Sequence, residues 1–321
     1  MKRFNGLFAG MVLGICATTL QAADSYPTRP VRIIVPTGAG GITDILARVI
    51  GHKLRDSFGQ QPVIIENRVG ASGIVGSQLV ANSPPDGYTL LMVFPTHVVN
   101  PSLYPDIPYD SVKAFSPITL VSSVASTLMV NAATPVKSVA ELIALAKAKP
   151  GQLNYGDVGS GSLVFLSAEL FSSLAGIKLT QVSYKGVPQS LAALLAGEIH
   201  MTWVVTAGTV LQQEKAGKVR LLGVTSKERR AAMPHVPPMA DAVPGYEAIG
   251  WNGILGPAGM APALVERLNQ DIVRIVRSPE FGQNLVAEGA TAVGNTPPEF
   301  DAIIRADIQK WAALLKSLPA K

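Results

Sequence analysis

The class of the fold is decided by one stretch, Val31-Arg32-Ile33-Ile34-Val35-Pro36-Thr37-Gly38-Ala39-Gly40-Gly41-Ile42-Thr43-Asp44. Its first five residues are mostly β-branched and predict a short strand, which the glycines close with a tight turn. From Ile42 to Leu54, apolar residues recur at the spacing of a helix. A strand, a glycine turn and a helix in this order are typical of a βαβ unit in a parallel sheet.

The same rhythm continues outward from this stretch and then restarts. Strands are predicted over residues 62–65 and 88–94, with a helix over 74–81 between them. After strands at 118–122 and 127–131, a helix over 139–148 leads into a second series. That series has a strand at 153–156, a glycine turn at 159–162 and a helix at 163–174. Further elements follow at 180–184, 189–195, 199–205, 210–216 and 219–225, then a strand-like segment at 246–255 and mainly helix to Trp311.

Two consecutive series predict an α/β fold of two lobes with a ligand cleft between them. We expect lobe 1 to comprise residues 24–123 and 238–321 and lobe 2 to comprise residues 124–237, so that the chain returns to the lobe it started. A length of 321 residues is ample for two domains. With 48% hydrophobic and 15% charged residues, the chain is not of the disordered or coiled-coil class.

The first 23 residues have the order of a secretory signal peptide. Lys2 and Arg3 precede an apolar run over residues 6–20, and small residues follow at Ala22 and Ala23, where we expect the cut. A lipid on Cys16 is the alternative. Cleavage would remove the only cysteine and leave a soluble periplasmic protein, which we expect to be a monomer. No block of Lys and Arg points to nucleic acid as a partner.

The two glycine turns are the candidate binding sites. A helix start carries unpartnered N–H groups and partial positive charge, and glycine lets a carboxylate or phosphate approach the backbone. A bulky residue at Gly41 or Gly161 should therefore abolish binding without disturbing a core. In the alternative interpretation, the turns only reverse the chain, and Asp44, Ser160 or Ser162 caps its own helix. The candidate residues are Thr37, Gly38, Gly40, Gly41, Thr43 and Asp44 in the first turn and Asp157, Ser160, Gly161 and Ser162 in the second.

Catalytic and metal-binding patterns are weak in this sequence. Gly38-Ala39-Gly40 with Glu66 imitates a dinucleotide fingerprint, but Thr43 stands where the third glycine belongs. The segment around Ser72 lacks the closing glycine of a hydrolase elbow, and Ser72 is better explained as a helix cap. The four histidines have no metal-ligand spacing. We therefore expect neither enzyme activity nor a cofactor or metal. A periplasmic enzyme acting on an organic acid, or a sensor read by a signalling partner, is the alternative.

Ten short motifs occur in order along the whole mature chain. They are Tyr26-Pro27-Thr28-Arg29-Pro30-Val31-Arg32, Val35-Pro36, Gly40-Gly41-x-x-Asp44, Ala47-Arg48, Glu66-Asn67-Arg68, Pro85-Asp86-Gly87-Tyr88-Thr89-Leu90, Pro150-Gly151-Gln152-Leu153-Asn154-Tyr155, Tyr184-Lys185-Gly186, Ala216-Gly217-Lys218-Val219-Arg220 and Pro257-Ala258-Gly259. As a set, these motifs resemble the Bug-type solute receptors, the extracytoplasmic component of tripartite tricarboxylate transporters. The resemblance implies a periplasmic binding protein fold that closes on a small organic acid and delivers it to membrane transporter subunits. It also implies that both glycine turns hold carboxylates, partly through water, with Thr96 and His97 as neighbours.

Two positions depart from that family's pattern. Phe165 stands where many relatives have histidine, and Thr202-Trp203-Val204 replaces a Met-Phe-Asp triplet, so a carboxylate near the cleft gives way to Val204. An apolar wall of Phe165 and Trp203 would favour an aromatic or medium-chain carboxylate over aspartate, glutamate or citrate. The alternative is that both positions only pack the core.

Overall fold

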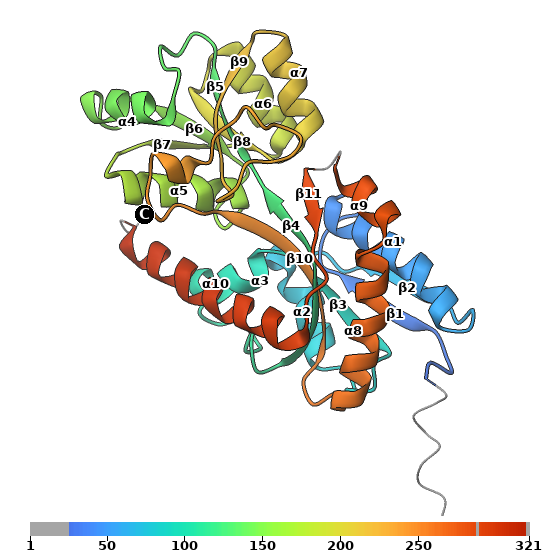
Figure 1. Ribbon diagram of the computed structural model, residues 1–321. Helices are drawn as coiled ribbons and strands as arrows, with labels where there is room; N and C mark the ends of the chain where they lie inside the picture. Colours follow the sequence, from blue (N-terminus) through green and yellow to red (C-terminus); the bar gives the residue numbers. More distant parts are fainter. Residues whose placement is uncertain (1–25, 287–288, 319–321) are drawn as a thin grey trace, which may run out of the picture.

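The computed structural model describes residues 26–286 and 289–318, which form two lobes, each a β-sheet flanked by helices (Figure 1). This is the two-lobed α/β architecture that the sequence predicts. The signal peptide, its cleavage and Cys16 lie outside the described residues. Among the helices of the described ranges, none combines the length and the apolar character needed to cross a membrane.

The sheet of lobe 1 has the strand order β11-β4-β10-β3-β1-β2. Strand β1 lies in the parallel part, paired with β2 on one side and β3 on the other, whereas β10 and β11 run antiparallel to their partners. The strands are β1 (Val31–Val35), β2 (Val63–Asn67), β3 (Thr89–Val93), β4 (Phe115–Ala125), β10 (Ile249–Pro257) and β11 (Ala290–Ala292).

The sheet of lobe 2 has the order β7-β6-β8-β5-β9. Strand β6 pairs in parallel with β7 and β8, and so occupies the place in this sheet that β1 has in the first. Strand β5 runs antiparallel to β8 and β9. The strands are β5 (Thr127–Asn131), β6 (Asn154–Asp157), β7 (Thr180–Ser183), β8 (Met201–Val204) and β9 (Val219–Val224).

Helices cover both sheets (Figure 1). Lobe 1 carries α1 (Ile42–Ser57), η1 (Ala71–Gly73), α2 (Ile74–Ala81), α3 (Thr96–Leu103), α8 (Pro262–Val276), α9 (Pro279–Val286) and α10 (Pro297–Ser317). The helices built on lobe 2 are α4 (Val139–Ala148), α5 (Leu163–Ala175), α6 (Val187–Ala196), α7 (Ala207–Lys215) and η2 (Met239–Asp241).

Two elements depart from the sequence prediction. Helix α3 begins at Thr96, directly after β3, where a strand end was expected. Pro101 lies inside it and disfavours a helix on local grounds, but packing against α10 holds the segment. Strand β11 lies in a region predicted to be helical, and it exists because Ala290–Ala292 pairs with β4. In both cases, contact with a distant part of the chain decides the local conformation.

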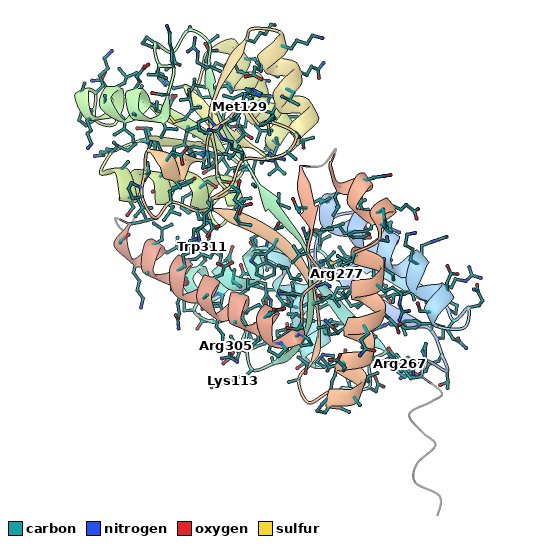
Figure 2. The ribbon with its side chains drawn as sticks, viewed as in Figure 1. Lys113, Met129, Arg267, Arg277, Arg305 and Trp311 are labelled. Atoms are coloured by element: carbon teal, nitrogen blue, oxygen red, sulfur yellow. The ribbon has the colours of Figure 1, made fainter. Side chains whose placement is uncertain are left out.

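An apolar core continues from one lobe into the other. The buried rings of Phe171 and Trp203 in lobe 2 belong to the same cluster as Trp251 and Trp311 of lobe 1. Figure 2 shows Trp311 on α10, on the side of lobe 1 that faces lobe 2, and Met129 inside lobe 2. Helix α10 also contacts α5. On this side, the two lobes therefore pack directly against each other.

The two connections between the lobes are tied together by hydrogen bonds among three buried residues, Ser126, Thr225 and Ala248. The Ser126 N–H donates to Thr225 Oγ1 and the Thr225 N–H donates to the Ser126 carbonyl, each at 2.9 Å, while the Ala248 N–H reaches the Thr225 carbonyl at 3.0 Å. The predicted lobe boundaries at residues 123 and 238 stay predictions. We propose instead that the lobes change at Ser126 and at Ala248, since β4 pairs in the first sheet as far as Ala125 and Tyr246 packs on lobe 2, donating to the Ser167 carbonyl.

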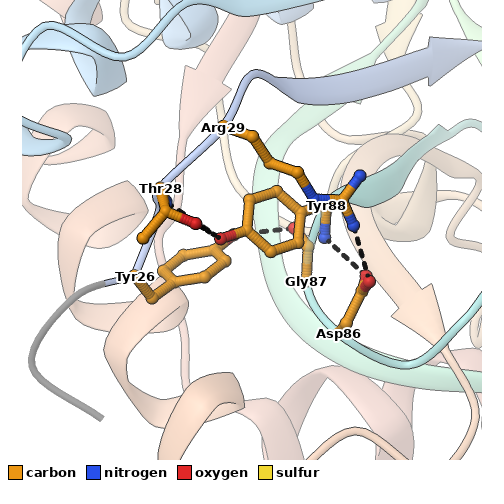
Figure 3. Close-up of polar contacts among 6 residues, drawn as sticks. All are labelled: Tyr26, Thr28, Arg29, Asp86, Gly87 and Tyr88. Carbon is orange, nitrogen blue, oxygen red and sulfur yellow. Dashed lines mark hydrogen bonds and ion pairs between the residues drawn. The ribbon is translucent and has the colours of Figure 1, made fainter. Parts of the chain in front are cut away.

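The first described residues are tied to the turn before β3 (Figure 3). The Tyr26 hydroxyl donates to the Gly87 carbonyl at 2.7 Å, and the Thr28 N–H donates to the Tyr88 hydroxyl at 2.9 Å. Arg29 pairs with Asp86 at 2.8 Å and its guanidinium lies 4.0 Å from the Tyr88 ring centroid. Two of the sequence motifs thus meet, and they serve the fold of lobe 1.

Candidate functional site

The two glycine turns follow equivalent strands. The turn at residues 37–41 comes after β1, and the turn at 158–162 comes after β6; each strand lies between two parallel neighbours. At such a place the connections leave in opposite directions along the sheet, and a crevice opens at the carboxyl ends of the strands. The structure therefore places both predicted turns where an open α/β sheet binds ligands.

The lobe 1 turn leaves the start of α1 open. Gly38, Gly40 and Gly41 are exposed, and Gly41 is the N-cap with an extended backbone and no side-chain hydrogen bond. Thr37 Oγ1, at the beginning of the turn, is buried without a hydrogen-bond partner among the described residues. An anion at this position would find the N–H groups of the first helical turn and a hydroxyl donor unused.

Asp44 supports this turn from behind. Its buried carboxylate accepts from the Gly40 N–H, from Arg48 Nε and from Asn67 Nδ2, each at 2.9 Å. The hydrogen bond from Arg48 is the main reason that the pKa of Asp44 falls to about 2, and the bonds from Gly40 and Asn67 add to it. Asp44 thus stabilises the conformation of the turn rather than capping α1. Its negative charge is already paired with the guanidinium of Arg48.

Thr43 ties the same helix to the strand that crosses between the lobes. Its hydroxyl donates to Asn252 Oδ1 on β10 at 2.8 Å, and both residues are buried. Thr43 can offer a ligand its backbone N–H, because its hydroxyl proton is already used.

The lobe 2 turn is built on a buried carboxylate as well. Asp157 accepts from the Gly159 N–H at 3.0 Å and from Ser183 Oγ at 2.7 Å, and it also accepts from Gln181 Nε2. Ser162 caps α5, since its Oγ accepts the Phe165 N–H at 3.2 Å. Ser160 is exposed. The capping interpretation therefore holds for Ser162, while Asp157 serves the shape of the turn.

The prediction that a bulky residue at Gly161 would touch no core is wrong. Gly161 is buried with φ at +84°, and a Cβ there would lie 2.9 Å from Leu103 Cδ1 and 3.6 Å from Val99 Cγ1, both on α3 of lobe 1. At Gly41 a Cβ would meet only the Gly38 carbonyl oxygen, at 3.9 Å. Gly41 is the position where approach to a helix start can be blocked cleanly.

The remaining predicted residues have side chains inside the lobes. His97 Nε2 lies 2.9 Å from the Ser111 carbonyl oxygen, and its ring stands edge-on to Phe115, where burial lowers the pKa of His97 to about 4. Thr96, next to it, is half-buried in the first turn of α3. Their part in ligand binding stays a prediction.

The expected apolar wall is likewise inside lobe 2. The Trp203 ring is wholly buried, edge-on to Tyr155 and Phe171, and Phe165 and Val204 are buried in apolar clusters. In this structure these three side chains present little surface to a ligand.

A strained turn that sequence reasoning missed stands beside the first site. Ala71 and Ser72 both have left-handed backbones, with φ at +45° and +55°. Ser72 is not the helix cap that the sequence predicts: α2 is preceded by Gly73, and Ser72 Oγ lies 3.0 Å from the Tyr104 hydroxyl. The run Gly70-Ala71-Ser72-Gly73 indicates a turn in the sequence. The conformation of that turn, however, depends on contacts with α3.

An exposed valine follows each of the strands β2 and β7, which lie beside β1 and β6. Val69, after β2, is 63% exposed, and Val187, the first residue of α6 after β7, is 43% exposed. Because β2 and β7 lie beside β1 and β6, these side chains occupy corresponding places at the carboxyl edges of the two sheets. They are exposed apolar side chains at the same edges of the sheets as the glycine turns.

Two of the weak sequence patterns, for a metal and for a dinucleotide, can be located in the structure. Within residues 26–286 and 289–318 no group of three or more His, Cys, Asp or Glu side chains is placed to hold a metal ion. Glu66, which the dinucleotide pattern singled out, pairs with Arg32 at 3.4 Å and with Arg68 at 2.9 Å. The Glu66 carboxylate is therefore already paired with two cations of lobe 1.

Comparison with known proteins gives a family match over most of the chain. The family model for the tripartite tricarboxylate transporter family receptor matches residues 46–319. Protein BugT of Bordetella pertussis is 35% identical over 303 residues, which cover 94% of this chain and 92% of BugT.

Two solved structures share the fold over their full length. "R. palustris Rpa4515 with adipate" is 35% identical, with a TM-score of 0.77, and the match covers 91% of this chain and 97% of that one. "MatC (Rpa3494) from Rhodopseudomonas palustris with bound malate" is 27% identical, with a TM-score of 0.74, over 90% of this chain and 100% of that one.

Proposed function

The chain belongs to the tripartite tricarboxylate transporter receptor family, and on that premise we propose that it captures a dicarboxylate between its two glycine turns and delivers it to the membrane subunits of its transporter. The observation that carries the proposal is the uncapped start of α1, with the Thr37 hydroxyl beside it, which has no hydrogen-bond partner among residues 26–286 and 289–318. A carboxylate is the ligand that such donors favour. The second carboxylate would meet the turn after β6, where Ser160 is exposed.

A medium-chain, unbranched body suits the surface between the turns. Val69 and Val187 are exposed at corresponding edges of the two sheets, and apolar contact with methylene groups is worth about 25 cal/mol per Å² of buried area. A solved relative of this chain carries adipate, a six-carbon dicarboxylate. The expectation of an aromatic or medium-chain acid rested on Phe165 and Trp203, whose rings are buried. We propose the aliphatic acid on the exposed Val69 and Val187 instead.

The receptor would act outside the cytoplasmic membrane as a monomer. Residues 1–23 have the order of a signal peptide, and the family consists of receptors. The mass of the exported protein should correspond to a chain beginning near Ala23 or Asp24, and sedimentation should give a single species of one chain. An intact Met1, or a lipid on Cys16, would refute the export route.

Titration calorimetry across a panel of acids tests the ligand class. We expect adipate to bind more tightly than malate, citrate, glutamate or benzoate, and to be recovered unchanged after incubation. The variant Gly41→Leu should weaken this binding about ten- to a hundredfold, whereas the control Gly59→Ala, at a lobe 1 glycine with open space around it, should keep it. Micromolar binding of citrate or glutamate without a response to adipate would overturn the proposal.

A further inference from the structure

An arginine between the lobes uses only part of its guanidinium within the fold. Arg230, in the loop after β9, donates from Nη2 to the Gly289 carbonyl of lobe 1 at 2.9 Å. From Nη1 it donates to the Val205 carbonyl at 3.2 Å and lies 3.4 Å from Thr127 Oγ1, both in lobe 2. A guanidinium has five N–H groups, so at least the Nε–H and one N–H of Nη2 find no acceptor among the described residues.

The positive charge of Arg230 is also unmatched in the described part of the chain. Burial lowers the pKa of Arg230, and its acceptors within residues 26–286 and 289–318 are two carbonyls and a hydroxyl, with no carboxylate among them. The bonds to both lobes fix the plane of the group. Nε and Nη2 flank one edge of that plane, and a carboxylate can accept two parallel hydrogen bonds from such an edge.

Arg230 lines a cavity of about 420 Å³ between the lobes, a volume typical of small-molecule sites. Its unpartnered Nε is not a buried atom, so a ligand can reach it. Ser123 on β4 and Thr291 on β11 stand opposite each other in the sheet, line the same cavity and keep their hydroxyls free of hydrogen bonds to described residues. Glu228 and Arg229, both exposed, add one charge of each sign to the lining.

The cavity is separate from the two glycine turns. Its lobe 1 lining comes from β4, β10, β11 and the residue before β11, and its lobe 2 lining from residues 226–232. Neither the turn at 37–41 nor the turn at 158–162 contributes to it. In the sheet of lobe 1, β11 is four places from β1, and neighbouring strands lie about 4.8 Å apart, so these two strands are roughly 19 Å from each other.

We propose that this cavity binds a small carboxylate on the Nε and Nη2 edge of Arg230, with the hydroxyls of Ser123 and Thr291 beside it. The site does not depend on the function proposed above, since it shares no residue with the glycine turns. Two sources offer the carboxylate, a separate small acid and the transported acid itself. Because Arg230 contacts both lobes, the bound anion would lie where the lobes meet.

The Nε–H resonance of Arg230 gives the direct test. In isotope-labelled protein this resonance is identified by its absence from Arg230→Lys, and acetate is titrated as the probe. We expect a saturable downfield shift, because the N–H gains a charged acceptor. The Nε–H resonance of Arg220 is the internal control and should not move. Arg220 also lies in lobe 2 and donates to backbone carbonyls, but it does not line the cavity.

Matched variants supply the affinity. Arg230→Lys keeps the charge but loses the planar fork, so it should bind acetate about ten- to a hundredfold more weakly than the control Arg220→Lys, as followed on the backbone N–H of Ala290. Should Arg230→Lys fold poorly, Ser123→Ala gives the same comparison with a smaller loss. In Gly41→Leu the response of Arg230 to acetate should persist.

Acetate decides the proposal, and adipate decides the source. A static Arg230 resonance, an equal shift at Arg220, or loss of the acetate response in Gly41→Leu would overturn the site. A response to inorganic phosphate without one to acetate would overturn the carboxylate class. An acetate response that adipate does not reproduce supports a separate small acid, whereas a response to adipate that Gly41→Leu abolishes supports the transported acid. Neither result for adipate alters the acetate test, so failure of the proposed function stays distinguishable.

Discussion

The two glycine turns occupy equivalent places in their sheets but begin their helices differently. In lobe 1 the N-cap is Gly41, which offers no side chain, and the turn is exposed. In lobe 2 the N-cap is Ser162, which satisfies the Phe165 N–H, and the turn packs through Gly161 against Leu103 of lobe 1. The lobe 1 turn therefore leaves the N–H groups at the start of its helix without a side-chain cap, whereas the lobe 2 turn uses one of its N–H groups within the fold.

Both turns have a buried carboxylate behind them, and the surroundings of the two carboxylates differ in one respect. Asp44 is paired with a cation, Arg48, whose own side chain is half exposed. The donors to Asp157 are the Gly159 N–H, Ser183 and Gln181, all neutral, and Asp157 is fully buried. Substituting each carboxylate in turn should therefore show how much stability comes from hydrogen bonds to a buried group and how much from its pairing with a cation.

The largest effect is expected from Asp157→Ala. It would remove the buried carboxylate that accepts from the Gly159 N–H and from the Ser183 and Gln181 side chains, and losing hydrogen bonds to a charged acceptor costs about 3 kcal/mol. Chemical denaturation should show this fall in the free energy of unfolding, together with loss of ligand binding. A decrease below about 1 kcal/mol would mean that water replaces the carboxylate.

Gly41→Leu should weaken ligand binding about ten- to a hundredfold, because the side chain would cover donors that make charge-assisted hydrogen bonds. The midpoint of thermal unfolding should stay unchanged, since no buried group lies near a Cβ at this position. Binding measured by calorimetry, with Gly59→Ala as control, decides the matter. Normal binding by Gly41→Leu would show that the ligand does not use the start of α1.

The charge on Asp44 should make stability depend on acid pH. Its pKa is about 2 in the folded protein and 3.8 in the reference state, so the stabilising contribution is complete above pH 4 and is lost as the pH falls toward 2. The shift corresponds to about 2 kcal/mol. Unfolding curves at pH 5, 4, 3 and 2 should therefore converge for the wild type and Asp44→Asn. A constant difference between the two proteins would contradict the assignment.

The smallest effect is expected from exchanging the caps. Ser162→Gly should destabilise the protein by a few tenths of a kcal/mol, whereas Gly41→Ser should stabilise it by a similar amount. Gly41→Ser should nevertheless weaken ligand binding, because its hydroxyl would occupy a backbone N–H that the ligand needs. If Gly41→Ser bound the ligand more tightly, the hydroxyl would be a ligand contact rather than a cap.

Much of the fold could be predicted from the sequence because its signals are local. The β-branched run before the first glycine turn forms β1 over Val31–Val35, and the apolar spacing after it forms α1. The helices predicted at 74–81 and 139–148 have those bounds in the structure. Periodicity and turn residues act within a few positions of the chain, so they can be recognised without the partners that later pack against them.

The site was predicted only in part, because the role of a polar side chain depends on what lies opposite it. Local sequence placed Asp44, Ser160 and Ser162 on equal terms as caps, but only Ser162 acts as one. Asn67 comes 23 residues after Asp44, and its bond to that carboxylate exists only because β2 lies beside β1. The apolar wall at Phe165 and Trp203 was expected on the surface, while packing with Tyr155 and Phe171 buries Trp203 inside lobe 2.

The sequence by itself determined the two βαβ series, the position of a glycine turn after the first strand of each, and the family. Tertiary structure alone decided which donors at those turns remain free, which carboxylates are already matched, and where the lobes touch. The hydrogen bond from Arg230 to the Gly289 carbonyl joins residues 59 positions apart, one in each lobe. Such a contact leaves no local pattern, since it is fixed by the order in which distant strands pair.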